Sequence, residues 1–160
     1  MKTTTGIVPM RLDLYLAETA RVAHEQSSLL DEARKRILAG QALNRLEESG
    51  VLHALQVLVE NAIGKAKHTV KSCNAPVPVS AYDAFASLKQ LGKLAGGSIE
   101  EWNSIIGLRN RIVHDYMSID MALVLGLVRE ERYRIVTKFL MQPIAGSSGA
   151  SADDSESGQK

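Results

Sequence analysis

Several residue types are scarce in this 160-residue chain, and each scarcity excludes a class of protein. The only cysteine, Cys73, excludes an intrachain disulfide, and the four histidines are too scattered to form a zinc site with it. With 19 basic and 18 acidic residues, the chain lacks the broad positive charge of a sequence-independent nucleic-acid binder. We therefore expect neither a bound metal nor a cofactor, and any anionic ligand must be held by a few local side chains.

Long apolar stretches are missing as well. No run approaches the roughly 20 residues that cross a bilayer, and residues 1–9 lack the apolar core of a signal peptide. Together with the single cysteine, this predicts a soluble, cytoplasmic protein without membrane contact. The length fits one domain, which we expect over 10–142, and the Gly, Ser, Ala and acidic composition of 143–160 predicts a flexible tail.

Apolar residues recur at helical spacing in about five segments, so the sequence predicts a single-domain, antiparallel all-α bundle. Gly40, the Pro-containing connector 74–78 and Gly96-Gly97 separate these segments. The expected helices cover about 10–38, 43–71, 80–91, 98–117 and 120–139.

Local signals refine three of these helices. Gln26-Ser27-Ser28 is a candidate interruption of the first helix, and Ser49-Gly50 is one of the second. Ser98 and Glu101 have the spacing of a capping box at the start of the fourth helix, in which each side chain bonds the other residue's amide.

The run Arg109–Tyr116 sets polar side chains into the apolar pattern of the fourth helix. At about 100° per residue, Arg109 and Tyr116 project onto the apolar stripe, whereas Asn110 and His114 lie one turn apart on its flank. A guanidinium keeps its charge, and burying it without a partner is costly. Arg109 must therefore face a carboxylate, a water-filled cleft or an anionic ligand.

These residue types suit metal-independent cleavage of RNA, in which the ribose 2′-hydroxyl attacks the adjacent phosphorus and the 5′-oxygen leaves. Imidazole exchanges protons near neutral pH, so His114 would act as acid or base. Arg109 offers a planar fork of donors that matches a phosphate and would stabilise the charge of the transition state. Asn110 would hold the imidazole or contact a phosphate oxygen.

Helical geometry constrains this pairing. Positions five apart lie about 140° apart around an ideal helix, so Arg109 and His114 do not share one face. Either Arg109 bends round, or the helix loosens near His114, or a two-fold axis brings two copies of the motif together. The last arrangement would supply one imidazole as base and another as acid.

The segment 102–116, followed by Ser118-Ile119-Asp120, resembles the signature of HepT-type HEPN toxins, R-x-x-x-x-H-x-Y. The likeness extends to 55–68, to the Pro-containing connector and to 82–94, and covers roughly 11–141 in all. With the flanking Trp102 and the order of the helices, it is far more specific than a bare R-x-x-x-x-H.

The resemblance implies a homodimeric all-α endoribonuclease toxin of a toxin–antitoxin pair. Its partner would be an MNT-type nucleotidyltransferase antitoxin encoded alongside, with which it would form a higher hetero-oligomer. Arg109 and His114 would match the catalytic pair, and Asn110 the polar position after the arginine. Tyr116 would match the tyrosine that the antitoxin modifies with AMP, which adds bulk and negative charge beside the site.

Other interpretations remain open at this point. The chain could be a non-catalytic helical partner that presents Tyr116 or a substrate to a nucleotidyltransferase. It could also be a plain helical scaffold in which Arg109 pairs with a carboxylate, the candidates being Glu18, Glu60 and Asp83.

Two basic clusters could extend a path for RNA, although a solvated helix face is the commoner role of such clusters. One is Arg34-Lys35-Arg36, and the other combines Lys65, Lys67 and Lys71 with His68.

Overall fold

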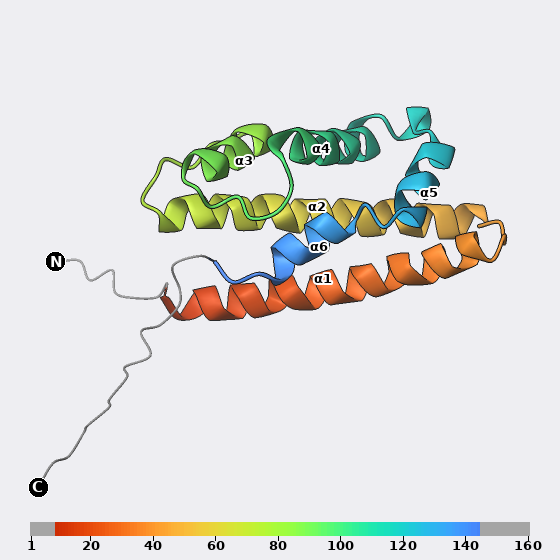
Figure 1. Ribbon diagram of the computed structural model, residues 1–160, viewed down its shortest axis with the longest axis horizontal. Helices are drawn as coiled ribbons and strands as arrows, with labels where there is room; N and C mark the ends of the chain where they lie inside the picture. Colours follow the sequence, from red (N-terminus) through yellow and green to blue (C-terminus); the bar gives the residue numbers. More distant parts are fainter. Residues whose placement is uncertain (1–8, 145–160) are drawn as a thin grey trace, which may run out of the picture.

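The computed structural model describes residues 9–144, and in this range the chain is an all-α bundle, as expected (Figure 1). Side chains are described from residue 12 onward. The elements are α1 (Pro9–Leu38), α2 (Arg45–Ser72), α3 (Ala81–Gln90), α4 (Ile99–His114), the 3-10 helix η1 (Tyr116–Ser118), α5 (Met121–Arg129) and α6 (Arg134–Met141). No helix in the described range is long and apolar enough to span a membrane.

The two longest helices, α1 and α2, form an antiparallel hairpin that carries the other elements (Figure 1). Gly40, at φ +75°, turns the chain after α1, and Asn44 caps α2 in a capping box with Glu47. Neither expected interruption is present. Ser27 stays in α1 because its buried hydroxyl pairs with Thr137 of α6 at 2.7 Å, and Gly50 lies on the exposed face of α2.

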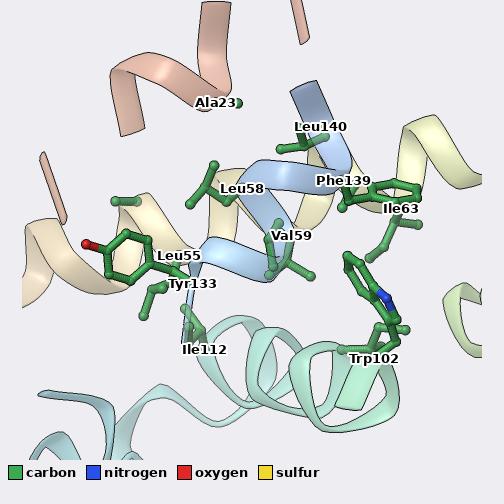
Figure 2. Packing of buried hydrophobic residues seen from close by; sticks show 14 of the residues in the cluster. Ala23, Leu55, Leu58, Val59, Ile63, Trp102, Ile112, Tyr133, Phe139 and Leu140 are labelled. Atoms are coloured by element: carbon green, nitrogen blue, oxygen red, sulfur yellow. The ribbon is translucent and has the colours of Figure 1, made fainter. Parts of the chain in front are cut away.

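The core forms where α2, α4 and α6 converge (Figure 2). Trp102 of α4 stacks on Phe85 of α3 with ring centroids 4.3 Å apart, and its edge meets Phe139 of α6 at 5.1 Å. Such aromatic contacts add to the stability given by apolar burial. Gly97 is required beside this cluster, because a Cβ there would lie 2.3 Å from the Cδ1 of Ile135 and the residue has φ +78°.

The last expected helix, 120–139, is two helices, so this prediction was wrong. α5 ends at Arg129, and Glu131 adopts φ +58° before α6 begins. Asp31 of α1 accepts hydrogen bonds from both Tyr133 and Arg134, which holds the turn on α1. The apolar residues keep their helical spacing through the turn and so predict one helix, but the contacts with α1 break it into two.

The fourth helix also ends earlier than expected. α4 stops at His114, and Asp115 and Ser118 close the turn around η1 through a hydrogen bond of 2.8 Å between their side chains. Tyr116 is therefore 48% exposed and Met117 is 93% exposed, and neither continues the apolar stripe. At its other end α4 begins with Ser98 accepting from the Glu101 amide at 3.1 Å, which is one half of the expected capping box.

The tail expected at 143–160 lies outside the described residues except for its first two positions. Of these, Ile144 is buried.

Candidate functional site

Arg109 lies in the third turn of α4 and lines a pocket of about 460 Å³ between α4, α2 and the region where α5 leads into α6. The pocket walls are mainly apolar, and Figure 2 shows three of the lining side chains converging from different elements, namely Leu55, Ile112 and Tyr133. Acidic and basic side chains also line it, namely Glu100, Glu101, Glu131 and Arg132. The half-buried guanidinium thus faces a space that a ligand or a partner chain can fill.

Arg109 has no carboxylate partner among the described residues. No ion pair within 9–144 includes it, and its Nε is buried without a hydrogen-bond partner. Of the carboxylates considered above, Glu18 binds Arg21 at 2.6 Å, and Glu60 accepts from Gln56 at 3.1 Å. The structure therefore does not support internal pairing of Arg109, and a buried donor is left with unused bonding capacity.

His114 is the last residue of α4 and is exposed. Its side chain makes no hydrogen bond to any described residue, so both ring nitrogens are open to solvent or to a ligand. A single copy of the chain does not join His114 to Arg109 by any bond, in line with the angular separation of five helical positions. The structure thus presents the two side chains but leaves them unconnected within one chain.

Asn110 contacts α3. Its Nδ2 donates to the hydroxyl of Tyr82 at 3.4 Å, and Gly107 leaves room for this contact, since a Cβ there would lie 3.7 Å from the same oxygen. Within the described residues Asn110 makes no hydrogen bond to His114. Tyr82 lies within the expected helix 80–91 and the segment 82–94 of the resemblance, and neither the helical period nor the spacing of the motif gave a sign of its contact with Asn110.

The hydroxyl of Tyr116 lies 3.2 Å from the hydroxyl of Ser49 on α2. This contact ties η1 to the second turn of α2, although the two residues are 67 positions apart. No local sequence signal could reveal such a contact, and Ser49 was considered only as a possible helix break.

Five of the exposed large apolar side chains belong to segments at this end of the bundle, where η1, α5 and the start of α2 lie together (Figure 1). They come from α2, α4, η1 and α5, and we refer to them as the apolar end set: Leu46, Val113, Tyr116, Met117 and Leu123. Leu46 is 81% exposed and Met117 is 93% exposed. Exposed large apolar side chains that lie side by side are typical of a surface that contacts another protein.

In the two basic clusters, Lys35, Arg36, His68 and Lys71 are exposed, and several members make contacts within the bundle. Arg34 pairs with Glu131 at 3.2 Å, and Arg36 pairs with Glu47. The suggestion that Lys65 is part of a solvated RNA path was wrong, because this side chain is only 3% exposed.

Lys65 instead donates to the carbonyl oxygens of Phe139, Leu140 and Gln142 at the end of α6. Its burial lowers the pKa of the ammonium group to about 8. The residue therefore closes the C-terminal end of α6.

The ring of exposed His68 packs against that of Tyr15, tilted by 34° with the ring centroids 4.1 Å apart. Desolvation, followed by the charge of Lys71, lowers the pKa of the imidazole. Near it, Lys67 donates to the carbonyl of Val79 at 2.7 Å. Among the described residues, no three His, Cys, Asp or Glu side chains gather in a way that could hold a metal ion.

Comparison with known proteins points to one family. Residues 23–142 match the family model described as Ribonuclease HepT-like. The chain is 30% identical to the mRNA nuclease HepT of Shewanella oneidensis over 84 residues. This aligned segment makes up 52% of this chain and 62% of that protein. It is 28% identical to a putative RNase of Archaeoglobus fulgidus over 133 residues, and this aligned segment makes up 83% of this chain and 92% of the relative.

A solved structure has the same fold. It is a tri-AMPylated HEPN toxin of Shewanella oneidensis in complex with its MNT antitoxin. The TM-score is 0.57 at 22% identity, over 74% of this chain and 93% of that one. Because the family model spans most of the chain, this protein belongs to the HepT-like ribonuclease family.

Proposed function

We propose that this chain is a metal-independent endoribonuclease toxin of a toxin–antitoxin system, acting in the cytoplasm. The observation that carries the proposal is Arg109, a half-buried cation with a buried, unpartnered Nε at the wall of a pocket. A permanent charge without a carboxylate partner is suited to binding an anion, and the phosphate of RNA matches its planar fork of donors.

The proposed reaction divides the work between two side chains. Arg109 orients the scissile phosphate and stabilises the charge that develops on its oxygens. The ribose 2′-hydroxyl attacks the phosphorus, and the bond to the 5′-oxygen breaks. His114, exposed and without a hydrogen-bond partner among the described residues, takes the proton from the nucleophile or gives one to the leaving oxygen. Asn110, held by Tyr82, is available for a second contact with the phosphate.

The proposed site lies in a cleft between two copies of the chain. One chain presents a single motif histidine, whereas acid and base catalysis in one step requires two proton carriers. The apolar end set around His114 offers a surface for a second copy or for the antitoxin. In a two-fold assembly each α4 would then contribute to the same cleft.

We further propose that an MNT-type nucleotidyltransferase neutralises the toxin by transferring AMP to Tyr116. The name of the solved relative records AMPylation of that toxin in complex with its antitoxin. In this chain Tyr116 stands two positions after His114 and is 48% exposed, so its hydroxyl can be reached from solvent. An adenylyl group there adds negative charge beside the phosphate site.

The test is cleavage of a 5′-labelled RNA by the purified protein in EDTA. We expect His114→Ala to lower the rate at least about 100-fold, the lower range for loss of an acid–base group. Arg111→Ala is the matched control, because this arginine is exposed on the same helix. Equal rates for wild type and His114→Ala would overturn the assignment.

Mixing wild type with the inactive His114→Ala variant tests the shared cleft. If the two His114 side chains of one dimer serve as acid and base, mixed dimers lack one of them, and the activity falls more steeply than the fraction of wild-type chain. Activity in proportion to that fraction, with mixed dimers shown to form, would favour a site within each chain.

The exposure of Tyr116 favours one other function, that of a non-catalytic helical partner presenting this tyrosine to the transferase. The cleavage assay separates the two functions, because such a partner would accept AMP without cutting RNA.

A further inference from the structure

The turn that carries Tyr116 is fixed in two independent ways. Its backbone is closed by Ser118, whose amide donates to the carbonyl of Asp115 at 3.0 Å and whose hydroxyl donates to the same residue's carboxylate at 2.8 Å. Its side chain is tied to α2, because the hydroxyls of Tyr116 and Ser49 lie 3.2 Å apart. The phenolic oxygen of Tyr116 therefore has a defined position relative to two helices.

The contact leaves the phenolic oxygen open to an incoming group. Tyr116 is 48% exposed, and Ser49 is itself exposed on α2. The neighbouring Gly50 also borders open space, since a Cβ at that position would meet no atom within 4 Å.

We propose that Ser49 is a positioning residue for adenylyl transfer to Tyr116, an inference that rests on the proposed function. When Tyr116 donates to the Oγ of Ser49, the proton of the phenol points toward α2 and the lone pairs of Oη are directed away from it. A nucleoside triphosphate held by the transferase then meets a nucleophile with a fixed direction of attack.

The transfer balances as a substitution at phosphorus. A bond forms between Oη of Tyr116 and the α-phosphorus of ATP, and the bond from that phosphorus to the oxygen bridging to the β-phosphate breaks. Pyrophosphate leaves, and the phenolic proton passes to water. The modified tyrosine has no proton to donate to Ser49, so the same step weakens the tie between η1 and α2.

The experiment measures adenylyl transfer from ATP labelled on its α-phosphate, using the purified chain and the nucleotidyltransferase encoded beside it. We expect Ser49→Ala to lower kcat about fivefold, the effect of losing one hydrogen bond of typical net strength, with little change in KM for ATP. Ser49→Thr keeps the hydroxyl and restores the rate. Gly50→Ala is the matched control and behaves as wild type, because its methyl group meets nothing.

Each outcome separates this inference from the function on which it rests. If the wild-type chain accepts no AMP at Tyr116, the proposed neutralisation fails, and the role of Ser49 fails with it. If the wild type is modified and Ser49→Ala is modified equally fast, only the role of Ser49 is overturned. Equal slowing by Ser49→Ala and Gly50→Ala, or no rescue by Ser49→Thr, would assign the effect to the helix surface and would also overturn it. Thermal melting of all three variants shows that they are folded.

Discussion

Two cationic side chains enter the interior of this bundle, and the structure treats them in opposite ways. Lys65 on α2 is 3% exposed and donates to carbonyl oxygens at the end of α6, including that of Phe139 at 2.6 Å. Arg109 on α4 is half-buried, forms no ion pair within 9–144 and has a buried Nε without a partner. A cation whose hydrogen-bond donors are bound by groups of the chain stabilises the fold, whereas a cation with an unbound donor can bind a ligand.

The same contrast extends to the surroundings of each residue. Where α6 packs on α1, the polar groups of Ser27 and Thr137 pair at 2.7 Å, and Asp31 binds Tyr133 and Arg134. At the C-terminal end of α4, His114 has no partner among the described residues. We therefore expect substitutions in the first region to change stability, and substitutions in the second to change activity.

Replacing Lys65 should give the largest change in stability. Lys65→Met leaves the carbonyls at the end of α6 without a donor in a buried place, and we expect the free energy of unfolding to fall by about 3 kcal/mol. Lys67→Met is the control, because Lys67 is less buried and donates only to the carbonyl of Val79. Urea denaturation measures both. A loss for Lys65→Met no larger than for Lys67→Met would contradict the structural role of Lys65.

The lowered pKa of Lys65 should make the stability of the protein depend on pH. Its pKa is lowered from 10.5 to about 8 in the folded chain, so between these values the unfolded chain holds a proton that the folded chain has lost. The contribution of Lys65 to the free energy of unfolding therefore rises as the pH rises between these two values. At the alkaline end Tyr133 acts in the opposite sense, because burial and then its bond to Asp31 raise its pKa.

The contribution of Lys65 is isolated by subtracting the stability of Lys65→Met from that of wild type at each pH. The difference should increase between pH 8 and 10.5. A constant or falling difference would mean that the ammonium group is not destabilised by its burial.

Of these substitutions, Tyr82→Phe should have the smallest effect, and it should change RNA cleavage but not stability. It removes the oxygen that accepts from Asn110 at 3.4 Å while keeping the ring, so we expect RNA cleavage to slow about fivefold with little loss of stability. Tyr15→Phe removes a hydroxyl near Gly64, away from α4, and is the control. Cleavage by Tyr82→Phe at the wild-type rate would exclude a role for Asn110 held in this way.

The features that the sequence predicted well are those set by local chemistry. The end of α1 and the starts of α3 and α4 follow from Gly40, from Ser80 as the N-cap of α3 and from Ser98 as the N-cap of α4, whose effects act within a few residues. The all-α architecture follows from the period of the apolar residues. These signals depend on no distant part of the chain.

The errors arose where distant contacts decide the structure. The turn between α5 and α6 depends on Asp31, about 100 positions earlier, and no local pattern near Glu131 records it. Tyr116 was expected on the stripe of α4, but the helix stops at His114 and the ring reaches Ser49 instead. The motif indicated where Arg109 and His114 lie along the helix. It did not indicate the contacts of Asn110 and Tyr116, because their partners lie on other helices.

The most direct test of this account is Arg109→Met, measured for unfolding and for RNA cleavage on the same preparation. Because Arg109 has no ion-pair partner within 9–144, we expect the free energy of unfolding to stay equal or to rise, while cleavage falls at least about 100-fold. A clear loss of stability, or cleavage at the wild-type rate, would contradict the claim that the bundle keeps this cation free for the phosphate of its substrate.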